Sequence, residues 1–534
     1  MGLGMKNIFT DNEEELVTNK SKKAIRTLIY MAVAVIFFII IAVIIKFSGD
    51  KDAIRREKII QDIKVVRTAV ENKAKEYMLN PSSVTLIGSN LESNPLSLEV
   101  NGVTEEYRYG YYLVTPEALK ELTSALNLPD ENYIVNYDTY DVINWNGIVY
   151  EKMRYHSLED LLLVEKGTKP AAKQIIRTAA DLEKIRQNPN GYFKLSGNLD
   201  LSDYTLGEGW KPIEQFGGTL DGRGYTISNL KVHRPSSQNV GLFGELTSTA
   251  NITNIKFSNV NVSGGQYVGV LAGIGAGNIS HVQVLSGSVA GQTNYIGGLV
   301  GSQNNGTISN CIVTLNSITG NQAIGGVVGI LYSGTLTKSG AKTTITGSES
   351  TGGIVGSVSA ISIGSVAYIH EVCSNVQITG NTNLGGLIGK IEVVAGNKID
   401  LKNSYSKGAI NGSNRNSGGF VGFISSVGVA NISFEALYTT LDILQKSSTS
   451  GGCIGYTDIA ITSAISLGDC FWEKDLAPGE FLNSVGSQAS NTFTLSFDDK
   501  SYSEMRIRNT FVNWDFDIWG INERVDTPYL NWEI

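Results

Sequence analysis

Acidic side chains are the groups in this sequence that could carry out hydrolysis or bind calcium. Enzymes that cleave polysaccharides on repetitive β-scaffolds need two or three carboxylates close together. Between Ser236 and Gly455 there are seven carboxylates, and no two are adjacent or separated by a single residue. Their scatter favours a protein that is not an enzyme, unless acids from different repeats converge. The seven are Glu245, Glu349, Glu371, Glu392, Asp400, Glu435 and Asp442.

Histidine and cysteine form no recognisable metal or redox motif. The string HEVCS, at 370–374, begins like the HExxH motif of zinc proteases but lacks the second histidine one helical turn later. The cysteines, Cys311, Cys373, Cys453 and Cys470, show no CxxC spacing, so we expect free thiols. We therefore expect no metal, no cofactor and no disulfide framework.

Glycine-rich strings that approach nucleotide-binding or calcium loops are also incomplete. LGGLIGKI, at 384–391, lacks the first glycine and the final Ser or Thr of a Walker A loop. Asp221, in TLDGRGYT, is one acid where calcium needs several, and Asp-Gly predicts a turn. No catalytic, cofactor-binding or metal-binding residue is assigned.

Aromatic residues near the C-terminus are the strongest candidates for contact with a ligand. Exposed rings can stack on sugar rings, whereas rings at the end of a repeat protein more often cover its open edge strands. We expect the second role, a plug over the open end, with sugar contact as the alternative. A chain truncated at Asp498 should then be insoluble. The residues are Trp514, Trp519, Tyr529 and Trp532.

One short phrase recurs along the chain and must build the scaffold that positions these residues. It consists of two glycines, two apolar residues and a third glycine, as in YIGGLVGS at 295–302 and STGGIVGS at 350–357. From one phrase to the next, the last glycine recurs every 27 to 33 residues. These repeat glycines are Gly244, Gly273, Gly301, Gly329, Gly356, Gly389, Gly422 and Gly455.

The segments between the phrases predict short strands. Apolar residues alternate with Asn, Ser and Thr, as in Ile255/Phe257 and Val282/Val284. Repeats of this length predict coils of three short strands that stack into an all-β, right-handed parallel β-helix, a solenoid of about a dozen coils. We expect the paired glycines to provide corners with positive φ as well as close stacking. The phrase is therefore predicted to be scaffold.

An N-terminal apolar stretch is predicted to anchor the protein in a membrane. Residues 27–45 are 19 uncharged residues, enough to cross the hydrocarbon layer as a transmembrane helix. Residues 1–26 are predicted to be a cytoplasmic tail, which places the C-terminal bulk outside the cell on a single-pass protein of the cell membrane. Residues 46–80 are predicted to form an amphipathic helix. Its apolar stripe is Ile59, Ile63, Val66, Val70 and Tyr77.

Two parts of the chain resemble known families. The phrase GG-[LVIFC]-[VI]-G resembles the GLUG repeats of bacterial surface proteins, which include adhesin-like proteins and the non-catalytic parts of immunoglobulin A peptidases. This resemblance implies an entry cap at 168–240, a GLUG-repeat β-helix at 241–480, and C-terminal coils with an aromatic cap at 481–534. The hydrophobic helix, the amphipathic helix and a small α+β region at 81–167 resemble the layout of type IV pilins and pseudopilins. That layout implies pilus or secretion-filament subunits as partners.

Charge and composition narrow the function further. The net charge is −8 and there is no basic stripe, so nucleic acid is not expected as a partner. Faces rich in Asn, Ser and Thr suit many weak hydrogen bonds to a glycan or to a host or matrix surface. We expect a membrane-anchored bacterial surface protein that presents a β-helix for adhesion or ligand binding. The alternatives are a surface polysaccharide-degrading enzyme and a passive structural spacer.

Overall fold

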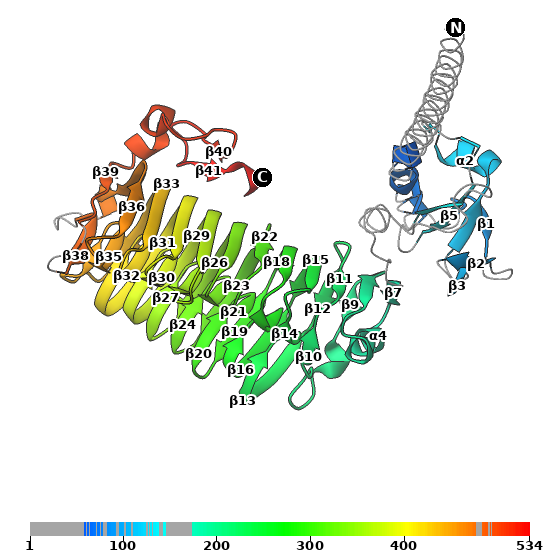
Figure 1. Ribbon diagram of the computed structural model, residues 1–534, viewed down its shortest axis with the longest axis horizontal. Helices are drawn as coiled ribbons and strands as arrows, with labels where there is room; N and C mark the ends of the chain where they lie inside the picture. The colour runs from blue at the N-terminus through cyan, green and yellow to red at the C-terminus, as the bar shows by residue number, and fades with distance from the viewer. Residues whose placement is uncertain are drawn as a thin grey trace, which may run out of the picture. The chain divides into compact units, whose positions relative to one another are not determined.

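The computed structural model describes residues 173–476, 483–489, 492 and 494–533, together with parts of 58–145 (Figure 1). The predicted cytoplasmic tail and transmembrane helix lie outside the described residues. Within the described residues, no helix is long and apolar enough to span a membrane. The chain divides into two compact units, Met1–Pro170 and Ala171–Ile534.

The N-terminal unit combines a helix with a small antiparallel sheet. The described residues of 58–77 are helical and bury Ile59, Val66 and Val70. Tyr77 is 37% exposed, so it does not continue this stripe as predicted. The sheet has the order β1-β4-β5-β6, and β2 pairs with β3 in a separate hairpin. The elements are β1 (Ser89–Asn90), β2 (Leu96–Val100), β3 (Val103–Tyr107), β4 (Tyr111–Val114), α2 (Pro116–Leu122), β5 (Asn132–Asn136) and β6 (Val142–Trp145).

The C-terminal unit is a parallel β-solenoid, as the repeats predict, with about ten coils in place of the expected dozen. One sheet holds ten strands that pair in parallel from coil to coil. These strands are β10 (Ile213–Phe216), β14 (Phe243–Leu246), β17 (Ala272–Gly275), β21 (Val300–Gln303), β25 (Val328–Leu331), β28 (Val355–Ala360), β30 (Ile388–Val394), β32 (Val421–Val427), β35 (Ile454–Asp458) and β38 (Val485–Gln488).

A second sheet of 23 strands forms the remaining sides of the coils. Long strands such as β29 bend around a corner and serve two sides. The strands are β7 (Lys173–Ile176), β8 (Tyr192–Leu195), β9 (Leu199–Asp200), β11 (Thr219–Asp221), β12 (Thr226–Ser228), β13 (Lys231–Val240), β15 (Asn251–Ser258), β16 (Val260–Val268), β18 (Asn278–Val284), β19 (Gly287–Gly291), β20 (Asn294–Gly297), β22 (Thr307–Ser309), β23 (Ile312–Thr319), β24 (Gln322–Gly325), β26 (Gly334–Thr346), β27 (Glu349–Gly352), β29 (Val366–Gly385), β31 (Lys398–Gly418), β33 (Asn431–Ile443), β34 (Ser450–Gly451), β36 (Ala464–Leu467), β37 (Cys470–Glu473) and β39 (Asp498–Lys500).

Short helical elements begin and end this unit. The helix α4 (Ala179–Glu183) starts with a capping box, in which the Thr178 side chain accepts from the Asp181 backbone N–H and the Asp181 carboxylate accepts from that of Thr178. The other elements are η1 (Lys184–Gln187), η2 (Ser202–Tyr204), η3 (Lys474–Leu476), η4 (Glu504–Arg506), η5 (Arg508–Phe511), β40 (Trp519–Gly520), β41 (Tyr529–Leu530) and η6 (Asn531–Glu533).

Each unit has its own hydrophobic core. The solenoid core runs without a break through the coils, from Ile176 to Phe497. The N-terminal core consists of residues between Ile59 and Val142. The solenoid core is built entirely from residues between 176 and 497, so we expect residues 171–534 to fold as a unit.

The coil turns its corner at a residue with a left-handed backbone conformation, two positions before the paired glycines. Successive coils place Ala323, Ser350 and Asn383 at this position, with φ of 54°, 56° and 58°. None of the paired glycines that follow them has a positive φ. The expectation that the glycines supply these corners is therefore wrong.

Close stacking is what the paired glycines provide. A Cβ atom on Gly326 would lie 2.0 Å from the carbonyl oxygen of Gly353 in the next coil, and a Cβ on Gly353 would lie 2.0 Å from that of Gly386. A Cβ on the third glycine of the phrase, Gly356, would lie 2.4 Å from the backbone nitrogen of Ile324. Because backbone atoms of neighbouring coils occupy the space, no larger residue fits.

Candidate functional site

One outward-facing column of side chains changes character along the solenoid. Strand pairing places Gln283, Ile312, Gly340, Cys373, Tyr405, Tyr438 and Phe471 in register on seven successive coils. Towards the C-terminal end the column is aromatic, and the Tyr405 and Tyr438 rings stack at 4.9 Å. Towards the N-terminal end it carries smaller or polar residues.

The C-terminal segment, residues 501–533, covers the aromatic part of this column. The indole N–H groups of Trp514, Trp519 and Trp532 donate to the Asp469 carbonyl, the Asn403 side chain and the Glu371 carbonyl. The Tyr438 hydroxyl donates to the Pro528 carbonyl. Asp469, Asn403 and Glu371 belong to different coils, so the segment runs along the side of the solenoid.

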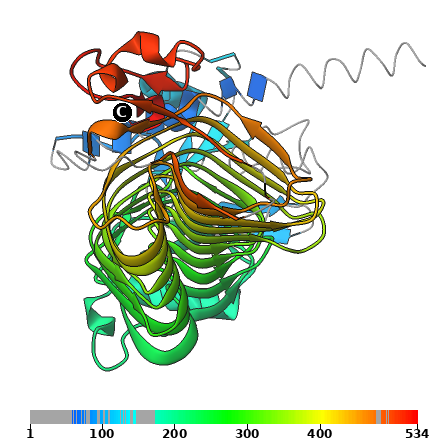
Figure 2. The ribbon, with the colours of Figure 1, turned by 90° about the vertical axis from the view of Figure 1, so that its left-hand side faces the viewer.

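The expected plug over the open end is therefore wrong in its location. Figure 2 looks at the C-terminal end of the solenoid, and the red segment lies beside the outline of the coils. Its rings, with those of Tyr405, Tyr438 and Phe471, form a separate hydrophobic cluster on that side. Tyr529 is part of β41, which pairs with β40 in this segment.

A groove of about 600 Å³ opens where the C-terminal segment ends. Its floor is the part of the column formed by Ile312, Gly340 and Cys373. Gly340 has no side chain, so the floor is deeper there. A Cβ atom at this position would lie 2.8 Å from the Cys373 sulfur. Tyr405, Trp532 and Glu533 also line it. The remaining lining residues are His281, Gln283, Asn310, Thr314, Ala341, Lys342, Ser374 and Asn375.

The aromatic and acidic groups of the groove are held in fixed positions. Glu533 accepts a hydrogen bond from the Tyr405 hydroxyl at 2.8 Å and another from the Leu530 backbone N–H at 2.8 Å. The Trp532 indole N–H donates to the Glu371 carbonyl at 3.0 Å. A preorganised ring beside a carboxylate can contact a sugar without paying much conformational entropy.

Two side chains that line the groove have raised pKa values. Burial, and next the Glu533 charge, raise the pKa of the Cys373 thiol well above its usual range, so the sulfur is a poor nucleophile. Burial likewise raises the pKa of Tyr405. Among the described lining residues Glu533 is the one carboxylate, whereas glycoside hydrolysis by a pair of acids needs two.

The seven carboxylates of the repeats lie elsewhere. None of them lines the groove. Glu371 lies 3.8 Å from Lys338, and Glu392 lies 2.8 Å from Lys390. Asp400 and Glu435 share Lys402, at 3.8 and 2.7 Å. Among the residues that the structure describes, no group of three His, Cys, Asp or Glu side chains could hold a metal.

Asp400 is the buried member of this set. Burial would raise the pKa of its carboxyl, but interactions with His370, Lys398 and Lys402 outweigh burial and lower this pKa to about 2. The folded state thus favours the ionised carboxylate. The stability that this carboxylate contributes is present above about pH 4 and is lost as the pH falls toward 2.

We expect Asp400→Asn to lower the free energy of unfolding by on the order of 2 kcal/mol at pH 7. Urea titrations of the two proteins between pH 7 and pH 2 measure this, and their midpoints should converge at the acidic end. Glu214→Gln is the control, because Glu214 and Lys211 form an exposed pair at 3.5 Å. A constant difference between Asp400→Asn and the native protein at all pH values would contradict the assignment.

Other residues singled out in the sequence have structural roles. The Asp221 carboxylate accepts from the Arg223 backbone N–H two residues later, in a turn as predicted. Cys311, Cys453 and Cys470 are buried free thiols. His370 lies on β29, 3.7 Å from Asp400.

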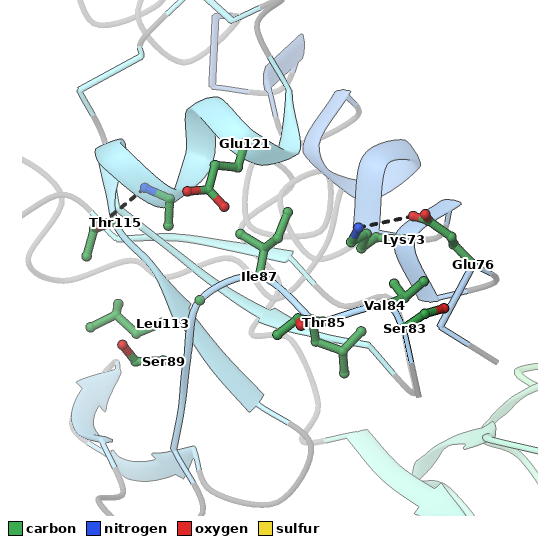
Figure 3. A pocket seen from close by; sticks show the side chains of 13 residues that line it. Lys73, Glu76, Ser83, Val84, Thr85, Ile87, Ser89, Leu113, Thr115 and Glu121 are labelled. Carbon is green, nitrogen blue, oxygen red and sulfur yellow. Dashed lines mark hydrogen bonds and ion pairs between the residues drawn. The ribbon is translucent and has the colours of Figure 1, made fainter. Parts of the chain in front are cut away.

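The N-terminal unit contains a separate cavity of about 560 Å³ (Figure 3). Lys73 and Glu76 line it and pair with each other at 3.1 Å. Thr115 also lines it, but its hydroxyl caps α2 by accepting from the Ala118 N–H. These three polar side chains thus already have local partners, and the groove on the solenoid is the stronger candidate site.

The fold and the groove define a parallel β-helix repeat protein with a covered side face. No family model matches the chain. Over 167 residues it is 34% identical to halomucin of Haloquadratum walsbyi, covering 29% of this chain and 2% of that protein. Over 207 residues it is 30% identical to the immunoglobulin A1 protease of Streptococcus pneumoniae serotype 4, covering 36% of this chain and 10% of that protein.

One solved structure is also similar. It is the crystal structure of a Bacteroides ovatus protein provisionally named an immunoglobulin A1 protease, which covers 67% of this chain and 92% of that one at 17% identity and a TM-score of 0.33. In contrast, the chain spans only a small part of the length of the curated proteins it matches, such as halomucin and the immunoglobulin A1 protease.

Proposed function

We propose that this is a cell-surface protein whose β-helix holds an extended glycan chain in the groove beside its C-terminal segment. The observation that carries the proposal is the fixed pair of Trp532 and Glu533 at the end of a groove lined by amide, hydroxyl and amine side chains. Ring faces contact the apolar faces of sugars, and the polar side chains hydrogen-bond to sugar hydroxyls.

The backbone geometry favours a glycan over a peptide strand. In the solenoid, backbone N–H and C=O groups of the floor strands pair with the neighbouring coils, as between β26 and β29. A peptide strand that binds by extending a sheet needs a free strand edge, and the side face of a coil offers only side chains. Recognition there must therefore use side chains.

Surface location and membrane attachment are part of the same proposal. The partial identity to halomucin and to immunoglobulin A1 proteases supports the resemblance to GLUG-repeat surface proteins. Residues 27–45 would hold the chain in the membrane, and residues 46–167 would join the solenoid to that anchor or to a pilin-like filament. Many copies on one cell would convert weak binding by each groove into firm adhesion.

A panel of bacterial and host polysaccharides tests the proposal. Residues 171–534 are incubated with each polysaccharide, and the mixtures are separated by size exclusion. Intact sugar that co-elutes with the protein supports a binding module. Shortened sugar chains would mean that the protein is a polysaccharide-degrading enzyme. If the protein retains no sugar and shortens none, it would be a passive spacer.

Two pairs of variants then locate the binding. Lys342 and Asn375 are neighbours in register and line the groove, whereas Thr344 and Gln377 are neighbours in the next outward column of the same strands. We expect Lys342→Ala with Asn375→Ala to weaken binding of the retained sugar by about 10- to 100-fold, because two hydrogen bonds are lost. Thr344→Ala with Gln377→Ala should leave the dissociation constant unchanged by calorimetry. Equal losses in both pairs would contradict the site.

A further inference from the structure

The later coils are longer than the earlier ones, and the added residues lie at one corner. The last glycines Gly356, Gly389, Gly422 and Gly455 are 33 residues apart, whereas Gly329 and Gly356 are 27 apart. Part of the added length lies in the strands of the ten-stranded sheet. Its strands grow from four residues in β25 to six or seven in β28, β30 and β32. A corner loop follows each of these strands and also the five-residue β35 in the next coil.

The corner loops after β28, β32 and β35 carry exposed aliphatic side chains, whereas the loop AGN at 395–397, after β30, carries none of them. The exposed fractions are 52% for Ile361, 103% for Ile363, 71% for Val427, 52% for Val429 and 66% for Ile461. The loop sequences AISIGS at 360–365, SVGVA at 426–430 and IAITS at 459–463 contain no charged residue. We call these five side chains the corner ridge.

The corner ridge is held in place by polar contacts on its inner side. The Asn397 side chain accepts from the Ser365 N–H at 3.1 Å and donates to the Ala360 carbonyl at 2.7 Å. The Ser426 hydroxyl accepts from the Ala460 N–H at 2.8 Å. The Gly396 N–H donates to the Val429 carbonyl at 2.8 Å. Because neighbouring loops hold each other, the aliphatic side chains are presented in a fixed row.

We propose that the corner ridge is the interface through which two copies of this chain associate. Five exposed aliphatic side chains present several hundred Å² of apolar surface, the upper end of what monomers leave uncovered. Two ridges face to face would bury roughly 1,000 Å² in total, near the lower limit for a specific, reversible interface.

Charge separates a second copy from anionic lipid as the occupant. The chain carries a net charge of −8, which opposes contact with anionic lipid and, over most of the surface, with another copy. The three loop sequences carry no charge, so contact between two ridges around a two-fold axis avoids that repulsion. Along the ridge, the loops after β28 and β32 are two coils apart, about 9.6 Å, and those after β32 and β35 are one coil apart, about 4.8 Å. Since the groove lies on another side of the coils, dimerisation would leave it open and double its valency.

Analytical ultracentrifugation of residues 171–534, from about 1 to about 100 μM, tests the proposal. We expect a monomer–dimer equilibrium in the native sequence. Ile363→Asn with Val427→Asn should raise the dissociation constant by about 100-fold, because each substitution occurs twice in a symmetric dimer. Both side chains are exposed, so the variant should keep the circular dichroism and the melting temperature of the native protein.

Leu206→Asn is the matched control. Leu206 is 87% exposed but lies outside the ridge, so this variant should dimerise like the native sequence. A native protein that stays monomeric over the whole range overturns the proposal, as does a dimer that Ile363→Asn with Val427→Asn leaves intact. Binding of the monomer to neutral phosphatidylcholine vesicles, lost in the same variant, would also overturn it by assigning the ridge to lipid.

Discussion

Replacement of Gly353 by alanine should destabilise the β-helix by at least about 3 kcal/mol, or prevent its folding. A Cβ atom at this position would lie 2.0 Å from the Gly386 carbonyl oxygen and 2.8 Å from the Ser374 Cβ. The obstructing oxygen belongs to the backbone of the next coil, which is fixed by parallel pairing on both sides. Urea unfolding of residues 171–534, followed by circular dichroism, measures the loss.

Gly197→Ala is the control for this substitution. Gly197 has no heavy atom within 4 Å of the position that a Cβ would take, and its φ is not positive. Alanine there should leave the midpoint unchanged or raise it slightly, because it restricts the unfolded chain. If Gly353→Ala unfolded at the native midpoint, close stacking would not be why the phrase repeats.

Replacement of Trp519 by alanine should release the C-terminal segment from the solenoid. Trp519 is 1% exposed, and its ring lies 4.5 Å from that of Trp514 and 5.9 Å from that of Tyr438. Truncating a buried tryptophan costs about 3–5 kcal/mol, which is enough to undock a short segment. Limited proteolysis should then cut within 501–533. The groove should lose affinity for its sugar because Trp532 and Glu533 leave with the segment.

The coils should survive the loss of Trp519. The solenoid core includes no residue of the C-terminal segment. The urea transition of the coils should therefore remain, while the exposed rings of Tyr405 and Tyr438 promote self-association. Val512→Ala, at a side chain that is 71% exposed on the same segment, should change neither proteolysis nor binding. Resistance of Trp519→Ala to protease would contradict a segment held by its aromatic rings.

The repeats predict the solenoid because their signal is local and periodic. Each phrase places apolar residues and glycines at the same positions of a coil, so spacing alone indicates stacking. The residues at the corners cannot be predicted in this way, because Ala323 and Ser350 have positive φ but carry no sequence signal for that conformation. Such residues are held at positive φ by the coils above and below them.

The side position of the C-terminal segment depends on contacts between distant residues. Trp532 meets Glu371 across 161 residues, and Tyr405 meets Glu533 across 128. One signal was present: Tyr405, Tyr438 and Phe471 are each 33 residues apart and so share the repeat period. An aromatic column on an outward face predicts that another segment of the protein covers it.

The groove itself could not be predicted from the sequence. It combines His281 and Asn310 at left-handed corners with Lys342 on β26 and with Trp532 and Glu533 at the far end of the chain. No motif joins these residues. Glu533 lies outside the repeats, beside Trp532 in LNWEI, so the scatter of acids within the repeats carries no signal for it.

A crystal structure of residues 171–534 with the polysaccharide fragment that the protein retains would test the proposed function most directly. We expect sugar rings in the groove, with one ring against Trp532 and hydroxyl groups bonded to Lys342 and Asn375. Sugar bound on another side of the coils, with the groove empty at saturating concentration, would contradict the account.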